Sequence, residues 1–392
     1  MSRLLVTLSL AAIAVATLSP ASGPAPATGV LCVLCGELGT PDLLVNLLLF
    51  APLGLGLALS GVSLRRIVVI CIALSAGIEL VQLLLPGRAP TLRDVLANGV
   101  GGGLGAALKL YLPALLRPAP RTTRLAWIAA LAPAVIVGGS GLLRAYDVPA
   151  ADYFLMVTPR QPHLARWDGK VDAVTLNGER LTPGPQGNQP AIREALLAGA
   201  EFEVSGVAGP TAPRLAGIVA IADDWPRQML LIGLDGDDLV IFTRRLASTF
   251  RFAEPPTRFP GALRGLAPGD SFDIRVSGPA DSVCAWVGGV GRCAGAAAAG
   301  SYWQLIRPLD DATVATRRTL DAVGVALLLI PLGLLLPALR RRQRVAVVLA
   351  ASGAFAISAL ASGLDLPRAA EWGGLLTGLL LGSLSHRVVR GE

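Results

Sequence analysis

The sequence contains few of the side chains on which soluble enzymes and metal proteins depend. In 392 residues there are two histidines, His163 and His386, and two lysines, Lys109 and Lys170. The histidines lie in separate regions of the chain, which argues against a histidine-rich metal site and a histidine-based catalytic triad. With so few lysines, a Walker-type nucleotide site is not expected. No catalytic residue and no metal ligand can be assigned from these side chains.

Charge is also scarce, and most of the positive charge is arginine. Charged residues form 16% of the chain and hydrophobic residues 53%, with a formal net charge of +7 and a mean hydropathy of +0.60. Such a chain is too apolar for an average soluble protein and fits a membrane protein that carries one soluble domain. The arginines cluster beside apolar stretches, so membrane topology explains them better than a nucleic-acid partner does.

Eight apolar stretches approach the length of about 20 residues that crosses the hydrocarbon core of a bilayer. They cover residues 4–19, 41–60, 65–85, 94–113, 124–142, 319–338, 344–362 and 370–386. Several are rich in glycine, alanine and proline, which membrane helices tolerate. The first stretch fits either a retained first helix or a cleaved signal peptide. The expected fold class is therefore an α-helical polytopic membrane protein.

The loops between these stretches carry their positive charge on one side. Arginines gather at 65–66, 117–124, 340–344 and 387–390, and Arg3 joins them. The positive-inside rule makes that side cytoplasmic. Residues 145–310 then face outward, between the fifth and sixth helices. We expect a multi-pass protein of a bacterial cytoplasmic membrane with this segment outside the cytoplasm.

Polar side chains recur at helical spacing in the stretch from 42 to 105. They are Asp42, Asn46, Ser75, Glu79, Gln82, Asp94 and Asn98, joined by the loop residues Arg88 and Arg93. Ionisable groups in membrane helices are costly and usually face a protein interior or a wet cavity. The charged members fall near the outer leaflet, which predicts a polar pocket there. Helix capping by Asp42 and Asp94 is the structural alternative.

This stretch resembles the VanZ-like family of small integral membrane proteins. The resemblance rests on Asp42, Asn46, Pro52-Leu53-Gly54, Glu79, Gln82, Arg88, Asp94, Asn98, Gly99 and Gly105. It covers roughly the first third of the chain. It implies a multi-helix membrane module linked to cell-envelope phenotypes such as glycopeptide-antibiotic tolerance. It implies no agreed biochemical activity.

The last three apolar stretches look like a second copy of this module. DLLVNLLLFAPLG at 42–54 matches DAVGVALLLIPLG at 321–333, with the same spacing from aspartate to proline. Each segment is followed by a basic turn, an apolar helix and a glycine-rich helix. This comparison places Ala369 opposite Asp94, so the second copy would have lost most of its polar set. Both copies run in the same direction, as in a parallel repeat; chance similarity among leucine-rich helices is the alternative.

Residues 145–310 change character to short alternating runs with frequent turns. Predicted strands lie at 152–158, 171–176, 201–207, 215–222, 228–234, 238–243, 271–277, 282–288 and 302–306. Asp235-Gly236 between two of them is a strong hairpin signal. The pattern predicts an all-β sandwich. It resembles laminin-G or concanavalin-like jelly rolls, which implies a domain that binds glycans or proteins.

Cysteines on the outer side are expected to be oxidised. Cys284 and Cys293 flank an apparent hairpin and are predicted to form a disulfide. Cys32 and Cys35 form a CxxC without the βαβ setting of a thioredoxin site, so a local disulfide or free thiols are expected there. Cys71 is predicted to be a plain apolar residue inside a helix.

Two groups of side chains in the outer segment permit a ligand. The aspartates Asp223, Asp224, Asp235, Asp237 and Asp238 offer oxygen ligands for Ca²⁺, although charged loop tips explain them equally well. The tryptophans Trp167, Trp225, Trp286 and Trp303 fit either sugar stacking or a sandwich core. No other cofactor is expected.

The chain is therefore expected to have five parts. They are a first helix or signal peptide at 1–19, a VanZ-like module at 20–116, a linking helix at 117–144, a β-sandwich at 145–310 and a C-terminal three-helix module at 311–392. The expected function is binding of a lipid or lipid-linked glycan head group at the outer leaflet. The sandwich would bind a cell-wall sugar or an envelope protein.

Two other functions fit the same residues. One is an enzyme that transfers or hydrolyses a group on a lipid-linked precursor, with Glu79 or Asp94 as general base and Arg88 and Arg93 as an anion clamp. The other is a transporter or flippase, which a parallel repeat suggests. Polar residues confined to one leaflet argue against a full translocation path.

Overall fold

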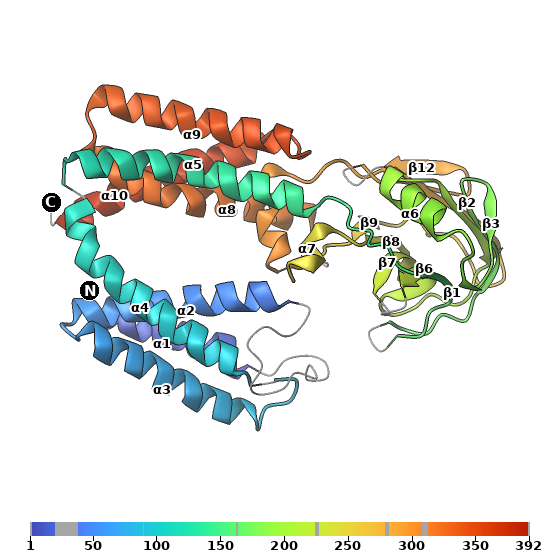
Figure 1. The fold of residues 1–392 in the computed structure, drawn as a ribbon, viewed down its shortest axis with the longest axis horizontal. Coiled ribbons are helices and arrows are strands. Elements are labelled where there is room, and N and C mark those ends of the chain that lie inside the picture. The colour runs from blue at the N-terminus through green and yellow to red at the C-terminus, as the bar shows by residue number, and fades with distance from the viewer. Residues whose placement is uncertain are drawn as a thin grey trace.

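The chain folds into two helical bundles and a β domain, arranged as Figure 1 shows. The computed structural model describes residues 2–19, 38–88, 90–115, 117–161, 164–223, 227–278, 282–307 and 313–390. The long helices are α1 (Ser2–Leu18), α2 (Gly39–Leu59), α3 (Leu64–Gln82), α4 (Leu92–Leu115), α5 (Pro120–Leu143), α8 (Val314–Leu335), α9 (Arg341–Ala361) and α10 (Ala369–Arg390). Helices α1 to α4 form the N-terminal bundle, and α5 packs with α8 to α10 in the C-terminal bundle.

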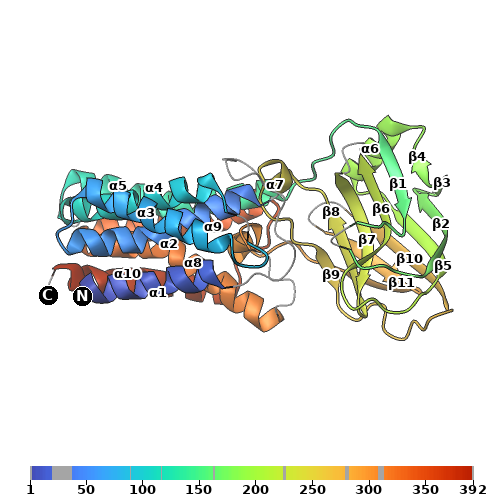
Figure 2. The same cartoon turned by 90° about the horizontal axis from the view of Figure 1, so that it is seen from below.

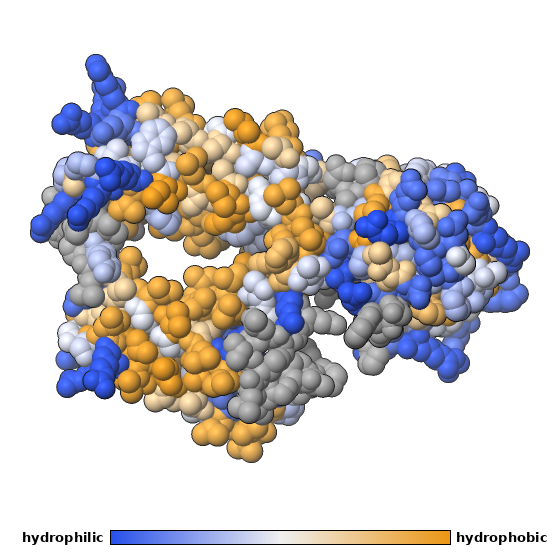
Figure 3. All heavy atoms as spheres, viewed as in Figure 1, coloured by the Kyte–Doolittle hydropathy of each residue, from blue (hydrophilic) through white to orange (hydrophobic). Residues whose placement is uncertain are grey.

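The bundles have the surface of a membrane protein. Among the described residues, α2, α5, α9 and the continuous segment Val314–Ala338 are long and apolar enough to cross a membrane. Leucine and valine side chains on the helices face outward, and Figure 3 shows the apolar band that they form. The turns α2–α3, α4–α5 and α8–α9, where the arginines gather, lie at the end of the bundles away from the β domain.

Glycines let the helices of each bundle meet backbone to backbone. In the N-terminal bundle, a Cβ on Gly101 or Gly105 would collide with the carbonyl groups of Leu47 and Ala51 on α2. In the C-terminal bundle, Gly374, Gly378 and Gly382 of α10 lie in the same way on Ala322, Ala326 and Ile330 of α8. Small residues at such contacts allow close van der Waals packing in a lipid environment, where no hydrophobic force drives helices together.

The outer segment is a two-sheet antiparallel β domain (Figure 2). One sheet has the order β4-β1-β6-β7-β8-β9 and the other β12-β11-β10-β5-β2-β3. The strands are β1 (Tyr153–Val157), β2 (Lys170–Leu176), β3 (Glu179–Leu181), β4 (Gly184–Pro185), β5 (Phe202–Val207), β6 (Ala216–Asp223), β7 (Gln228–Asp235), β8 (Asp238–Thr243), β9 (Thr257–Phe259), β10 (Ser271–Ser277), β11 (Cys284–Val287) and β12 (Val290–Cys293). The predicted hairpin at Asp235-Gly236 joins β7 to β8, with Gly236 at φ +59°.

Alternation along the strands builds the core between the two sheets. Strands β5 and β10 bury every second residue, whereas every residue of β6 is buried. Helix α6 (Gln189–Ala198), which the sequence pattern did not reveal, adds Ile192 and Leu196 to this core. Trp167 packs edge-on against Phe272, with ring centroids 6.0 Å apart. Trp167 therefore serves the core and is not available to stack on a sugar.

The strand predicted at 302–306 is wrong. This segment belongs to a 3₁₀ helix, η1 (Ala299–Leu305), that lies on α8 and not in a sheet. The Tyr302 hydroxyl donates to the carbonyl of Gly324 at 3.0 Å, and the Trp303 indole donates to the Asp321 carboxylate at 2.8 Å. Aromatic residues raise strand propensity, but here their polar tips are bound by a helix, so tertiary contacts override the local preference.

Hydrogen bonds between main-chain segments tie the β domain to the C-terminal bundle. Leu246 N–H donates to the carbonyl of Ala145 at 2.9 Å, and Ala253 N–H donates to that of Leu305 at 2.8 Å. Glu254 fixes this junction, because its Oε1 accepts from the Arg245 N–H at 2.7 Å and from the Ser248 hydroxyl at 2.5 Å. The junction is thus part of the folded structure and not a free linker.

We predict that Gly105→Ala destabilises the N-terminal bundle. The new methyl group must push α4 away from the carbonyl of Ala51, at a cost of about 1–3 kcal/mol for overpacking. Gly77→Ala in α3 is the matched control, since nothing lies within 4 Å of its Cβ position. Thermal unfolding in detergent measures both variants. Equal unfolding midpoints for the two would contradict the packing described.

We predict that the stability of the folded protein depends on pH because of Glu254. Burial raises the pKa of this carboxyl above its usual value of 4.5, against the lowering effect of its hydrogen bonds from Ser248 and Arg245. A raised pKa in the folded state means that stability is lost as pH rises from about 4.5 through the folded-state pKa. Glu254→Gln keeps an acceptor oxygen and should abolish this part of the loss. The test is to measure the unfolding midpoints of the wild type and of Glu254→Gln as the pH rises from about 4.5. If the two midpoints change with pH in the same way, the prediction is refuted.

Candidate functional site

Arg93 is the centre of the polar residues in the N-terminal bundle. Its Nη2 lies 3.1 Å from Asp42 Oδ2 and its Nε lies 3.3 Å from Asp94 Oδ1. Asn46 Nδ2 donates to the same Asp94 oxygen at 2.8 Å. We call Asp42, Asn46, Arg93 and Asp94 the outer cluster. It joins the first turns of α2 and α4, the helices that the glycines hold together.

The local sequence explains why these side chains meet. Asp42 and Asp94 each stand in the first turn of a helix, where a carboxylate offsets the positive end of the helix dipole. Thr91 precedes α4 and its hydroxyl accepts from the Asp94 N–H at 3.3 Å. The Arg93 side chain is 7% exposed, whereas that of Asp42 is 55% exposed. The cluster therefore has a buried cation and one carboxylate open to the surroundings.

Three further predicted residues hold α3 against α4. Glu79 Oε2 accepts from the Thr91 N–H at 2.8 Å, which fixes the chain just before α4. Deeper in the bundle, Asn98 Nδ2 donates to Ser75 Oγ at 2.8 Å. The buried Asn98 Oδ1 has no hydrogen-bond partner among the described residues. Glu79 thus borders the outer cluster, while Ser75 and Asn98 form a separate contact between helices.

Gln82 and Arg88 lie elsewhere, on the end of α1. Gln82 Nε2 donates to the carbonyl of Thr17 at 2.8 Å. Arg88 Nη2 donates to the carbonyls of Ser19 and Ala16 at 2.8 and 3.0 Å. Unpaired carbonyls at a helix C-terminus need such donors. Of the eight predicted pocket residues, the structure therefore brings four into the outer cluster, with Glu79 beside it.

This combination of helices and polar residues has a counterpart among known families. Residues 10–113 match the family model described as VanZ/LLP1. The N-terminal bundle is therefore similar to this family. The match extends from α1 to α4 and ends before α5. No curated protein and no solved structure matches the chain. We call α1 to α4 the VanZ-like module.

Glycine contacts relate the VanZ-like module to the C-terminal bundle in a defined register. Gly101 lies on Leu47 as Gly378 lies on Ala326, and Gly105 lies on Ala51 as Gly382 lies on Ile330. In both comparisons, the residue number in α10 exceeds that of its counterpart in α4 by the same amount. That shift pairs Asp94 with Glu371, whereas the sequence comparison had placed Ala369 there. An acidic residue therefore stands at the start of the glycine-rich helix in both bundles.

The acidic residues of the C-terminal bundle are closed off by η1. Asp321 is 5% exposed and Glu371 is 1% exposed. Asp321 Oδ1 accepts from the Trp303 indole at 2.8 Å, and Glu371 Oε1 accepts from the Gly300 N–H. The other Glu371 oxygen accepts from the Arg368 N–H at 2.8 Å. In this bundle a segment of the chain itself supplies the hydrogen-bond donors.

Three of the five aspartates considered for Ca²⁺ have partners within the β domain. Asp223 pairs with Arg227 at 2.6 Å, Asp235 pairs with Arg258 at 2.8 Å, and Asp238 accepts from the Gly261 N–H at 2.8 Å. The described residues contain no group of three or more side chains suited to a metal ion. Asp224 and Trp225 lie outside the described residues.

The cysteines of the β domain pair as their spacing predicts. Cys284 and Cys293 form a disulfide between the neighbouring strands β11 and β12. Cys71 is free and buried in the VanZ-like module. Cys32 and Cys35, for which a local disulfide or free thiols were expected, lie outside the described residues.

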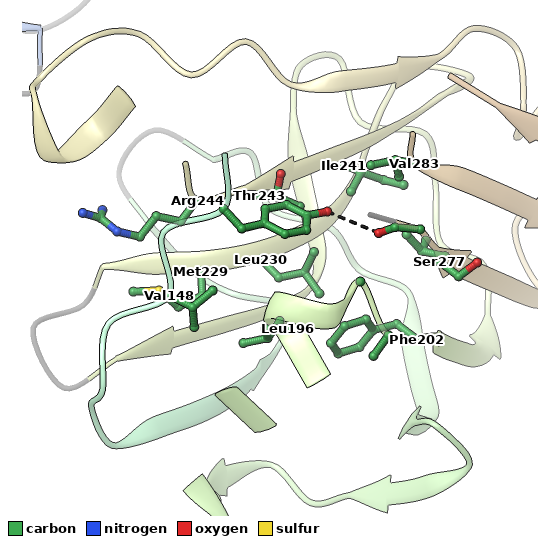
Figure 4. Close-up of a pocket in the computed structure, with 15 residues that line it drawn as sticks. Val148, Leu196, Phe202, Met229, Leu230, Ile241, Thr243, Arg244, Ser277 and Val283 are labelled. Carbon is green, nitrogen blue, oxygen red and sulfur yellow. Dashed lines mark hydrogen bonds between the residues drawn. The ribbon is translucent and has the colours of Figure 1, made fainter. Parts of the chain in front are cut away.

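A small gap lies in the interior of the β domain. Figure 4 shows this gap between the two sheets, where the Tyr146 hydroxyl donates to the carbonyl of Gly278 at 3.5 Å. Its volume of about 30 Å³ has room for little more than a water molecule. Leu196, Phe202 and Ile241 line it. This gap is therefore too small for a sugar.

We predict that Arg93→Ala destabilises the VanZ-like module strongly. The change leaves Asp94 and Asp42 without their shared cation, and loss of one partner of a buried ion pair costs roughly 3 kcal/mol or more. Adding Asp42→Asn and Asp94→Asn should restore much of the stability, because it removes the unpaired charges. Thermal unfolding of the single and triple variants measures this. A triple variant that is less stable than Arg93→Ala would show that charge pairing is not the main effect.

Proposed function

We propose that the protein is a multi-pass protein of the bacterial cytoplasmic membrane that binds the polar head group of a lipid or a lipid-linked glycan at the outer leaflet. The observation that carries this proposal is the outer cluster, in which buried Arg93 holds a half-exposed Asp42 carboxylate at the end of the helices nearer the β domain. Placing charged side chains in a membrane module costs free energy, and a role in ligand binding explains why they are present.

The proposed topology follows from the distribution of arginine. All eight long helices would span the membrane, with α1 retained and the basic turns in the cytoplasm. Residues 145–310 would then lie outside, in the compartment where the disulfide Cys284–Cys293 is stable. The arrangement of the ribbon, with both termini at the end away from the β domain, supports this orientation.

The chemistry of the outer cluster favours a ligand that donates hydrogen bonds. Asp42, Asp94 and Glu79 contribute three carboxylates near one buried guanidinium, that of Arg93. Sugar hydroxyls and ammonium groups donate to carboxylates, and such charge-assisted bonds are stronger than neutral ones. A glycan or an amine-bearing head group therefore suits the cluster better than a bare phosphate does.

As a second copy of the module, the C-terminal bundle supports a ligand that donates hydrogen bonds to the outer cluster. We propose a parallel repeat in which α8 to α10 are the second copy, since α10 lies on α8 through glycines as α4 lies on α2. In the second copy, Asp321 and Glu371 receive N–H donors from η1. The equivalent positions in the VanZ-like module, Asp42 and Asp94, would receive the donors of a ligand.

Binding is preferred here to group transfer or transport. The anion clamp expected of an enzyme needed both Arg88 and Arg93, but Arg88 donates to the end of α1. A translocation path would need polar residues through the depth of the bilayer, and the charged cluster lies at one end of α2 and α4. The outer face of the β domain, with its laminin-G or concanavalin-like pattern, would contribute recognition of a sugar or an envelope protein.

The test is to identify what the VanZ-like module retains. Full-length protein, purified in detergent after incubation with the lipid extract of its source, is examined by native mass spectrometry. We expect a bound lipid-linked glycan or amine-bearing lipid whose occupancy falls roughly tenfold in Asp42→Asn and Asp94→Asn, in line with the loss of one charge-assisted hydrogen bond.

Asp365→Asn provides the matched control. Asp365 lies in the loop between α9 and α10, and its carboxylate makes an exposed pair with Arg368 at 2.6 Å, which contributes little to stability. The control should retain the ligand of the wild type. Folded Asp42→Asn and Asp94→Asn variants with undiminished occupancy would refute the proposed binding site.

A further inference from the structure

A cavity of about 440 Å³ lies where the C-terminal bundle meets the β domain. Its walls come from the ends of α5 and α9, the first turns of α8, and the segments around β9 and β11. Its described lining residues include four arginines, Arg144, Arg245, Arg258 and Arg317, and among these described residues there is no aspartate or glutamate. The volume falls within the usual range of small-ligand sites, about 300–1,000 Å³.

The arginines are held in place by the fold. Arg144 Nη2 donates to the carbonyl and the hydroxyl of Ser301 at 3.0 and 3.1 Å. Arg245 Nη1 donates to the carbonyl of Arg144 at 2.7 Å. Arg258 Nη1 lies 2.8 Å from Asp235 Oδ2. The cavity wall therefore presents guanidinium groups whose positions are set before any ligand arrives.

Two of these guanidinium groups have unused donors. The Nε atoms of Arg144 and Arg258 are buried and have no hydrogen-bond partner among the described residues. Most buried polar groups are hydrogen-bonded, so each exception needs an explanation. Both Nε atoms face away from the open cavity, but the guanidinium groups that carry them border it, so their positive charge acts on an anion placed there.

The electrostatic balance also favours an anion. Burial, and then the positive charge of Arg245, lowers the pKa of Arg144 to about 10, against the opposing effect of Asp321. Two nearby carboxylates contact the arginines without lining the cavity. Asp235 pairs with Arg258, and Glu254 accepts from the main chain of Arg245. Like charges crowded around a cavity make a positive potential that a bound anion relieves.

We propose that this junction cavity binds a phosphate group through the four arginines that line it. Arginine forks match the geometry of phosphate oxygens. The phosphate can belong to a lipid head group or be free in solution. Apolar Leu142 and Leu364 among the lining residues, at the ends of the helices, favour the lipid. This site is separate from the outer cluster and does not depend on it.

The experiment measures binding to full-length protein with two probes. In detergent, inorganic diphosphate is titrated against the protein by calorimetry. In phosphatidylcholine nanodiscs, the unfolding midpoint is compared with and without phosphatidylglycerol, since a ligand that binds only the folded state raises it. Diphosphate binding identifies a soluble phosphate as a ligand; stabilisation by phosphatidylglycerol alone identifies the lipid head group.

Arg317→Gln is the test variant and Arg318→Gln its control. The two arginines are neighbours on α8 and the changes remove the same charge, but Arg318 is exposed and does not line the cavity. We expect the affinity of Arg317→Gln to fall roughly tenfold or more, as one charge-assisted contact is lost, and that of Arg318→Gln to match the wild type. Arg317→Lys should recover part of the loss because it restores the charge.

A second variant keeps the proposal testable if Arg317→Gln folds poorly. Arg258→Gln combined with Asp235→Asn removes a cavity arginine together with its own partner, so no unpaired carboxylate remains. The proposal is overturned if neither probe binds the wild type, or if both probes bind the wild type and the folded cavity variants equally. Asp42→Asn should leave binding here unchanged, which separates failure of this site from failure of the outer cluster.

Discussion

The direct contact between the backbones of α2 and α4 is the constraint on which the VanZ-like module depends. Gly101 and Gly105 have no side chain to hold the helices apart, so α4 lies on the carbonyl groups of α2. This distance brings the first turns of both helices together and sets Arg93 between Asp42 and Asp94. Packing and electrostatics are therefore linked: the ion pairs stabilise a helix contact that the glycines make possible.

The acidic side chains of the two bundles have different surroundings. In the C-terminal bundle Asp321 and Glu371 are buried beneath η1, while in the VanZ-like module Asp42 keeps half of its side chain exposed. In the VanZ-like module Arg93 donates to both aspartates, whereas in the C-terminal bundle the Trp303 indole and the Gly300 N–H of η1 are the donors. The carboxylates are thus held either by an arginine, with one carboxylate open, or by a closed contact with the chain itself.

Much of the fold follows from local patterns, and most of the site does not. Apolar stretches predicted the helices, and alternation predicted most strands and the β7–β8 hairpin, because both signals repeat within a few residues. The partners of Arg88, Gln82 and Trp303 depend on elements far away in the chain, so their roles were not predictable. The alignment of Glu371 with Asp94 by glycine contacts was missed for a similar reason, because those contacts join helices that are distant in the sequence.

The 3₁₀ helix η1 has a mechanical consequence. It follows the last strand of the β domain and is hydrogen-bonded to α8 through Tyr302 and Trp303 and to the first turn of α10 through Glu371. Arg144, at the end of α5, holds the same segment through Ser301. These bonds act in parallel, because each joins η1 to a different helix. A force that reaches η1 from the β domain is therefore shared among α5, α8 and α10.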